Sequence, residues 1–552
     1  MALLPRALHA LLPGLPAGLL LATSHLGLQP AAAQDLPNIV VVYADDLGYG
    51  DLSAYNLDAA YETPRLDRMA AEGIRFTDAH SPSTICSPSR AGLYSGQLIC
   101  RTGRGSRAFE GPGGPSYLEP GMTTIADVVR AEGYRTAVFG KWHVGLTWFD
   151  GEGERLGGGF DNSLRIDYER SCPLVDGPNA RGFDVSFVTP NCPTTDPLYL
   201  YLEDGMAVVP ASVRHERDRL PNPGGKWRWD NDEGWMAPGY RFVGADQLFL
   251  EKALAFIRSH REERPDEPFF LVLSTQISHA PVLPSPEYAG SSGAGPRGDF
   301  VRELDDLTGQ LLDALEELEI DERTLVMFNS DNGPETVHTR WMREDHGHDA
   351  AGGLRGMKRD GWEGGHRVPF IARWPGHIPA GQVSGQLTNT TDLFATVASL
   401  VGHELPASVA VDSFDMLPAM LGLQEESEPI RPHMLTQSFR GEFQLRVGPW
   451  KYLAHAGSGG NDYSKGWMRE LALPTEGSPP TEDPPPTENP PPPVQLYHLG
   501  KDPGETRNLA GAEAEKRAEL ASLLSRLTAA EGGRTAPRSR PPLPRAVALG
   551  ER

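Results

Sequence analysis

The chain has 552 residues with 39% hydrophobic and 8% aromatic content, enough to bury the core of one large domain and a smaller one. Its formal net charge of −23 argues against nucleic acid as a partner, although local cations can still bind an anionic substrate. The four cysteines, at positions 86, 100, 172 and 192, show no CxxC or Cys/His spacing of a zinc site.

The first 33 residues have the composition of an export signal. Residues 11–21 form an apolar stretch, broken by Pro and Gly, that is too short to span a bilayer. Ala31-Ala32-Ala33 then provides a small-residue cleavage site. We therefore predict a signal peptide over 1–33, no transmembrane segment, and an exported protein that is periplasmic, secreted or luminal.

Short apolar runs alternate with helical patterns through the larger part of the chain. Strands are predicted at 38–43, 136–139, 269–274 and 325–329, with a weaker candidate at 369–373. Helices are predicted at 65–72, 124–132, 245–259, 300–317 and 392–401. This alternation predicts an α/β domain over 34–425 with a mixed, mostly parallel sheet flanked by helices.

The pattern changes after residue 425. Residues 433–455 and 494–499 are typical of strands of a smaller antiparallel sheet, and 512–530 of a terminal helix. Together they predict an α+β domain over 426–531. Its segment 474–493 is dense in Pro, Thr and Glu and is predicted to be an extended or disordered insertion. The Arg- and Pro-rich tail, 532–552, is predicted to be disordered.

The segment Cys86-Ser-Pro-Ser-Arg90 precedes a helix-compatible run. Pro88 suits the first turn of a helix, where its missing N–H costs nothing. The free amides and positive dipole end of that helix favour an anion, toward which Cys86 would project, with Arg90 one turn further on. A lone cysteine is more often a buried hydrophobe or half of a disulfide, but the Pro and Arg beside it favour a functional role.

Polar residues follow four of the predicted strands at the points where the strands end. Taken alone, each group of polar residues is typical of an ordinary turn or loop. Because ligands bind at the carboxyl ends of strands in open α/β sheets, the set predicts one site. The residues concerned are Asp45, Asp46, Lys141, His143, His279, Asp331 and Asn332.

The predicted site contains two adjacent pairs, Asp45–Asp46 and Asp331–Asn332, whose side chains offer only oxygen atoms as metal ligands. Such donors suit Ca²⁺ or Mg²⁺ rather than zinc, and calcium tolerates the irregular geometry of two pairs from distant loops. Three carboxylates around a dication leave about one net negative charge, so an anionic substrate needs further cations. Arg90, Lys141 and Lys358 are the candidates.

Lys141 and His143 are two residues apart, so an extended backbone would direct both side chains to the same face. One can hold an oxyanion while the other, with a reference pKa near ~6.5, moves a proton. Cys172 and Cys192 can close a loop by a disulfide in an oxidising compartment, leaving Cys100 unpaired, but spacing alone leaves that pairing open.

These motifs resemble those of the type I sulfatases, members of the alkaline phosphatase-like superfamily whose cysteine is converted to formylglycine. The resemblance covers 37–46, 86–90, 268–376, 495–499 and 502–509, whereas the Pro-rich insertion and the tail have no counterpart. Residues 279–306 look like those of bacterial arylsulfatases and of N-acetylgalactosamine-6-sulfatases. The resemblance implies a large alkaline phosphatase-like domain followed by a smaller domain with an antiparallel sheet.

The resemblance also implies a mechanism. Cys86 would be converted by a formylglycine-generating enzyme and hydrated to a diol on Ca²⁺. One hydroxyl would attack sulfur while the alcohol leaves, and loss of the second proton would expel sulfate. The implied calcium ligands are Asp45, Asp46, Cys86, Asp331 and Asn332.

The roles of the remaining residues follow from the same resemblance. Arg90 would orient the diol, and Lys141 and Lys358 would hold sulfate oxygens. His143 would take the proton from the diol, and His279 with Lys358 would help the leaving oxygen depart. The implied substrate is an extracytoplasmic sulfated carbohydrate or an aryl sulfate.

Other functions remain open at this stage. A phosphonate or phosphate monoester hydrolase of the same superfamily would share the metal and cysteine motif, because sulfate and phosphate are both tetrahedral oxyanions. A choline-sulfatase-like specificity fits export less well. An inactive sugar-binding homologue would have lost polar site residues, yet every recognisable one is present.

Overall fold

The computed structural model describes residues 36–103, 113–114, 116–158, 160–216, 233–463, 468 and 493–529. The predicted signal peptide (1–33), the Pro-rich insertion up to residue 492 and the C-terminal tail (532–552) lie outside these residues. Within the described part of the chain, every helix is too short or too polar to cross a lipid bilayer.

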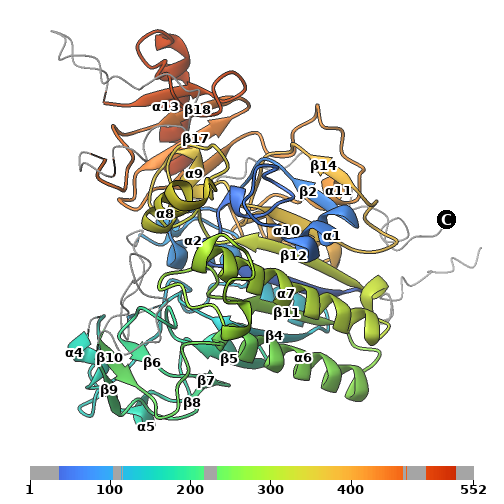
Figure 1. Ribbon diagram of the computed structural model, residues 1–552, viewed down its shortest axis with the longest axis vertical. Coiled ribbons are helices and arrows are strands. Elements are labelled where there is room, and N and C mark those ends of the chain that lie inside the picture. The colour runs from blue at the N-terminus through green and yellow to red at the C-terminus, as the bar shows by residue number, and fades with distance from the viewer. Residues whose placement is uncertain are drawn as a thin grey trace, which may run out of the picture. The chain divides into compact units, whose positions relative to one another are not determined.

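A ten-stranded mixed sheet runs through the larger domain (Figure 1). Its middle strands are parallel to one another, and antiparallel strands flank them on both sides. In spatial order the strands are β14 (Gln382–Ser384), β2 (Ile74–Phe76), β13 (Phe370–Arg373), β12 (Thr324–Ser330), β1 (Asn38–Ala44), β11 (Phe269–Ser274), β4 (Arg135–Lys141), β5 (Val185–Thr189), β7 (Leu202–Glu203) and β8 (Met206–Ala207). The predicted mixed, mostly parallel sheet is confirmed.

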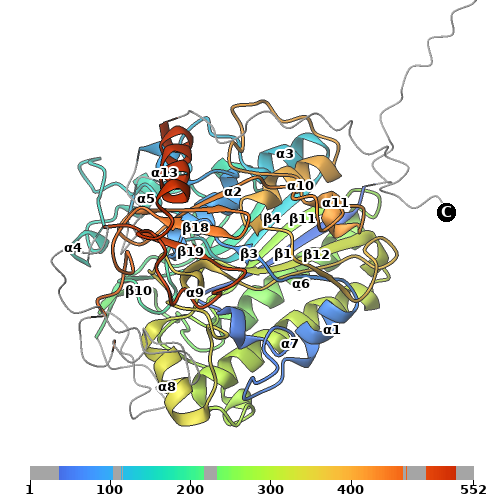
Figure 2. The same cartoon turned by 90° about the horizontal axis from the view of Figure 1, so that it is seen from above.

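Helices cover both faces of this sheet, as Figure 2 shows with α1, α6 and α7 on one side and α3, α10 and α11 on the other. The helices of the larger domain are α1 (Pro64–Ala71), α2 (Cys86–Ser95), α3 (Ile125–Ala131), α4 (Phe160–Ser163), α5 (Tyr168–Ser171), α6 (Ala245–Glu263), α7 (Gly295–Glu317), α8 (Thr336–His346), α9 (Glu363–His366), α10 (Asp392–Leu400) and α11 (Leu417–Met420). All five predicted helices are present. Helix α7 begins before the predicted residue 300 because Pro296 occupies its first turn.

The alternation of side chains along β1 separates two hydrophobic cores. Ile39, Val41 and Tyr43 face the core shared with α2, α3 and α10. Val40 and Val42 face the core shared with α1, α6 and α7. A continuous apolar run is what a strand needs when both faces of its sheet are covered by helices.

The four-stranded sheet of the C-terminal region is antiparallel, as predicted. It consists of β16 (Met434–Gln437), β17 (Phe443–Val447), β18 (Trp450–Leu453) and β19 (Gln495–His498), and α13 (Ala514–Ala529) packs against it (Figure 1). Two small sheets complete the fold: β6 (Leu198–Tyr199), β10 (Gly234–Met236) and β9 (Val213–His215), and the pair β15 (Thr388–Asn389) and β3 (Ala79–His80). The domain boundary near residue 425 stays a prediction.

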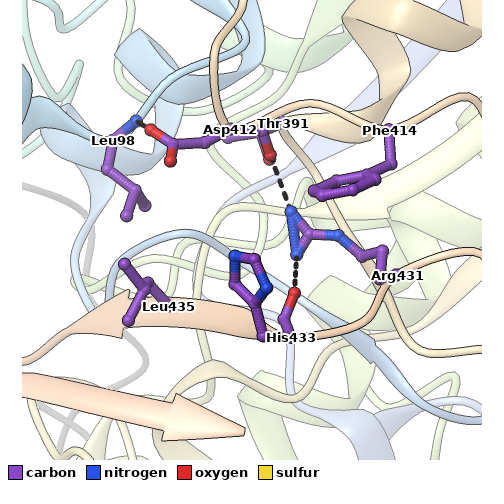
Figure 3. A pocket seen from close by; sticks show the side chains of 7 residues that line it. All are labelled: Leu98, Thr391, Asp412, Phe414, Arg431, His433 and Leu435. Carbon is purple, nitrogen blue, oxygen red and sulfur yellow. Dashed lines mark hydrogen bonds between the residues drawn. The ribbon is translucent and has the colours of Figure 1, made fainter. Parts of the chain in front are cut away.

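A small cavity lies where the C-terminal sheet meets the larger domain (Figure 3). Its central Arg431 donates to the backbone oxygen of Asp412 at 2.7 Å and pairs with Asp392 at 3.1 Å. The full lining is Leu98, Thr391, Asp412, Phe414, Arg431, His433 and Leu435. The Arg431 guanidinium thus connects its own segment to Asp392 and Asp412, which is a structural role. None of the predicted site residues lines this cavity.

The C-terminal sheet also supports the segments that carry Cys86 and Lys358. The backbone of Gln437 on β16 exchanges hydrogen bonds with Pro82 and Thr84, just before α2. Lys451 on β18 is buried and contacts Glu363 at 2.9 Å and Glu505 at 3.0 Å. Glu363 begins α9, which follows the loop of Lys358.

We expect Lys451→Ala to lower the free energy of unfolding by about 3–5 kcal/mol, because it leaves the buried carboxylate of Glu505 without its cation. Denaturant unfolding followed by circular dichroism measures this change. Lys501→Ala removes an exposed lysine of the same region and serves as the control. Equal stabilities of the two variants would contradict the structural role given to Lys451.

Candidate active site

The carboxyl ends of the parallel strands bring the predicted residues to one edge of the sheet. Asp45 and Asp46 follow β1, His279 follows β11, and Asp331 follows β12. Donor atoms of Asp45, Asp46, Cys86 and His279 all lie within 4.8 Å of one another. Residues separated by more than two hundred positions are therefore neighbours because β11, β1 and β12 are hydrogen-bonded side by side.

Two buried oxygens of the acidic cluster have no hydrogen-bond partner among the described residues: Asp45 Oδ1 and Asn332 Oδ1. The Asn332 amide is oriented by its Nδ2, which donates to Asp46 Oδ1 at 2.7 Å. The Asp46 N–H donates to Asp331 Oδ1 at 3.1 Å. An unpaired buried acceptor costs about 1–3 kcal/mol, so oxygens left over in this way fit a cation that the protein binds.

The charges of the cluster support the same conclusion. Burial raises the pKa of Asp331 well above its usual range, and the nearby carboxylate of Asp45 raises it further. For Asp45, burial acts in the same direction, but Lys141 and His279 outweigh it and hold the pKa of Asp45 below the usual range. Three carboxylates and an amide oxygen are donors that a hard divalent cation prefers. These residues therefore fit a divalent metal.

Three buried cations contact the three carboxylates, and Arg90 lies near two of them, 2.8 Å from Asp331 and 3.6 Å from Asp45. Lys141 Nζ donates to Asp45 Oδ2, and Lys358 Nζ donates to Asp46 Oδ2 at 2.7 Å. The Arg90 guanidinium binds Asp331 Oδ2 through Nε at 2.9 Å and Nη2 at 2.8 Å. Arg90 also donates to the backbone oxygen of Lys141 at 3.1 Å, which fixes the guanidinium against β4.

Cys86 is the first residue of α2, and its side chain is buried. The positive end of the helix dipole favours negative charge on a sulfur at this position. Burial by itself raises the pKa of the Cys86 thiol, but Lys141 and Lys358 outweigh it and lower the pKa to about 7. The position thus favours an anion or a polarised oxygen.

The expectation of an extended backbone through His143 is wrong. Strand β4 ends at Lys141, and His143 adopts the left-handed conformation with φ of 51°. Its N–H donates to the backbone oxygen of Pro190 at 3.2 Å, so the chain turns toward the segment after β5. The His143 Nε2 atom lies 3.6 Å from Asp196 Oδ2.

The imidazole of His279 is anchored through Nδ1. This atom lies 2.6 Å from the backbone oxygen of Ala280 and 3.2 Å from Cys192 Sγ. The other nitrogen, Nε2, lies 3.7 Å from Asp46 Oδ2. Burial lowers the pKa of His279, but Cys192 and Asp46 outweigh it and raise the pKa well above 6.5. The ring therefore carries a proton toward the cluster.

Two residues of the site, Cys192 and Asp196, were not predicted to belong to it. Cys192 was a candidate only for a disulfide with Cys172, but all four cysteines are free in the structure. Both missed residues lie between β5 and β6. The run Val185–Thr189 contains three apolar residues and a β-branched threonine and is followed by a proline, and this signal could have identified the extra strand.

Arg297 is a third residue that sequence analysis missed. Its side chain is completely buried on α7 and donates to the backbone oxygen of Asp46 at 3.1 Å. The same nitrogen binds Asp51 Oδ2 at 2.6 Å. Asp46 has a φ of 54°, which is uncommon for a residue with a side chain. Arg297 thus holds the loop after β1 from behind in the conformation that presents Asp46.

Comparisons with known proteins agree with this arrangement. A model of the family described as Sulfatase matches residues 37–403. The N-acetylgalactosamine-6-O-sulfatase of Bacteroides thetaiotaomicron is 32% identical, and the match covers 93% of this chain and 98% of that protein. Human arylsulfatase A is 35% identical, with 93% of this chain and 90% of that protein covered.

A solved structure from work on glycosaminoglycan metabolism by Bacteroides thetaiotaomicron has a similar fold. Its TM-score is 0.72 at 28% sequence identity, and the match covers 90% of this chain and 100% of that one.

We expect Asp45→Asn to weaken binding of a divalent metal by at least about 10-fold, because the number of charged ligands sets the affinity of such sites. Elemental analysis of the dialysed protein measures the bound metal. Glu317→Gln removes an exposed acid on α7 and provides the control. The metal site is refuted if both variants retain the same metal content.

Proposed function

This chain belongs to the sulfatase family and is a sulfuric ester hydrolase; we propose that it acts through formylglycine at position 86 and calcium. The observation that carries the proposal is the meeting of three buried carboxylates and three buried cations around Cys86. The carboxylates fit a dication, and the cations fit an anionic ester. A neutral substrate would offer no negative charge to the N–H groups of the cations that remain after the carboxylates are bound.

The proposed calcium ligands are Asp45, Asp46, Asp331, Asn332 and the group at position 86. The unpaired oxygens of Asp45 and Asn332 support this assignment, as does the absence of nitrogen donors from the two acidic pairs. Bound calcium and hydrated formylglycine would supply a polarised nucleophilic oxygen at the N-terminus of α2. Calcium is favoured over Mg²⁺ because the ligands come from irregular loops rather than from a regular octahedron.

Two lysines are proposed to bind the sulfate group, and Arg90 is proposed to orient the group at position 86. Lys141 and Lys358 are buried, and each has one carboxylate partner, so their remaining N–H groups are available for sulfate oxygens. Burial lowers the pKa of Lys358, but Asp46 outweighs it and raises the pKa, which keeps the ammonium charged. Arg90 is fixed by Asp331 and orients the group at position 86.

The two histidines are proposed to move protons in different steps. His279 presents Nε2 to the cluster and is suited to donate a proton to the departing ester oxygen. His143 is proposed to accept the proton whose loss releases sulfate. Its Nε2 contact with Asp196 stabilises the charged ring that results.

The proposed substrate is a sulfated carbohydrate or an aryl sulfate. The relatives that support this choice are an N-acetylgalactosamine-6-O-sulfatase and an arylsulfatase A. Each match covers most of this chain and most of the relative. A sulfated glycan lies outside the cytoplasm, so the substrate agrees with the predicted signal peptide over 1–33 and with export to the periplasm or medium. Maturation at position 86 would require a formylglycine-generating enzyme.

The alternatives are less consistent with these observations. A phosphate or phosphonate hydrolase has less support, because the family model and the curated relatives are those of sulfatases. An inactive sugar-binding protein has less support, because no polar residue of the predicted site is missing. Hydrolysis of 4-nitrophenyl sulfate compared with 4-nitrophenyl phosphate separates the first alternative from the proposal.

We expect Cys86→Ala to lower kcat/KM for 4-nitrophenyl sulfate by about 1,000-fold or more, because the proposed nucleophile is lost. Steady-state kinetics measures this loss, and circular dichroism checks that the fold is retained. Cys100→Ala, at a cysteine outside the site, is expected to keep its activity. Full activity of Cys86→Ala would refute the mechanism.

A further inference from the structure

The loop between β5 and β6 touches both histidines of the active site. Asp196 faces His143, with 3.6 Å between Oδ2 and Nε2, and Cys192 Sγ lies 3.2 Å from His279 Nδ1. The histidines themselves follow different strands, β4 and β11. This one loop therefore provides a contact to both His143 and His279, although the two histidines follow different strands.

This loop is held firmly enough to position a side chain. The Cys192 N–H donates to Asp196 Oδ2 at 2.5 Å, which ties the loop to itself. The Tyr240 hydroxyl donates to the backbone oxygen of Pro193 at 2.8 Å, and the Thr189 hydroxyl donates to that of Asn191 at 3.0 Å. Cys192 is 2% exposed. Its sulfur is consequently a fixed point beside His279.

The contacts of His279 define which nitrogen can transfer a proton. The backbone oxygen of Ala280 can only accept, so His279 Nδ1 carries the hydrogen of the 2.6 Å contact. The Cys192 sulfur lies on the same side of the ring and accepts from the same N–H. Only Nε2 faces the acidic cluster. The transferable proton is therefore the one on Nε2.

We propose that Cys192 is a positioning residue that holds the His279 ring with Nε2 toward the ester oxygen that leaves. Without its sulfur, the ring has one anchor, the carbonyl of the next residue, and can tilt about it. This inference rests on the proposed function. It adds a role for a cysteine that neither binds metal nor becomes the nucleophile.

The proton transfer that Cys192 supports balances as follows. As the deprotonated nucleophilic oxygen forms its bond to sulfur, the bond between sulfur and the ester oxygen breaks. The electron pair of the broken bond goes to the ester oxygen, which takes the proton from His279 Nε2. The ring is cationic while both nitrogens carry hydrogen, and the transfer leaves it neutral, with its remaining hydrogen on Nδ1 between Ala280 and Cys192.

Leaving-group chemistry distinguishes this role from general structural support. A weakly acidic phenol leaves poorly without a proton, whereas 4-nitrophenol leaves well as its anion. For Cys192→Ala we expect kcat/KM to fall about 10- to 100-fold for phenyl sulfate and less than about 3-fold for 4-nitrophenyl sulfate. The ratio of the two values is insensitive to any inactive fraction of the variant.

Two further variants complete the experiment. Cys192→Ser is expected to recover most of the loss on phenyl sulfate, because a hydroxyl oxygen also accepts from Nδ1–H. Cys172→Ala changes a free cysteine outside the site and is expected to leave both values unchanged. All variants are measured as full-length protein with calcium present.

The outcomes separate this inference from the proposed function. An equal loss of Cys192→Ala on both esters, or no loss on either, would overturn the positioning role while wild-type activity stands. A serine variant as poor as the alanine variant would also overturn it. Inactivity of the wild-type protein on both sulfates would overturn the proposed function and this inference with it.

Discussion

Mutual repulsion among three buried carboxylates at one edge of a sheet is the constraint on which the rest of the site depends. Asp45, Asp46 and Asp331 are completely buried, where an unpaired charge is very unfavourable. Each is paired with at least one cation from another part of the chain. Oxygens remain that no described group satisfies, so the arrangement fits a metal as well as a substrate anion.

Residues outside the cluster maintain that arrangement by contacting the backbone segments that carry its side chains. Arg297 on α7 holds the backbone of Asp46, and the C-terminal sheet supports the segments before Cys86 and after Lys358. The smaller sheet thus contributes to the site without providing a residue to it. A sulfatase built in this way keeps its cations and carboxylates in place before substrate arrives, which lowers the reorganisation needed during the reaction.

Much of this was predictable because the central strands are continuous apolar runs that end in charged residues. Such runs predict that these strands share one sheet and that Asp45 meets Asp331 at its edge, whereas the pairing of β1 with both β11 and β12 comes from the structure. The left-handed turn at His143 was not predictable, because it depends on hydrogen bonds to the segment after β5. Cys192 was not predicted to lie in the site because β5, the short strand before it, has only a weak sequence pattern.

The measurement that tests the central claim most directly is peptide mass spectrometry across residue 86 after thiol alkylation of active protein from its native host. The account predicts a peptide that escapes alkylation at this position and is about 18 Da lighter than the cysteine form, as expected for formylglycine. Complete alkylation of Cys86 in a preparation with full sulfatase activity would contradict it.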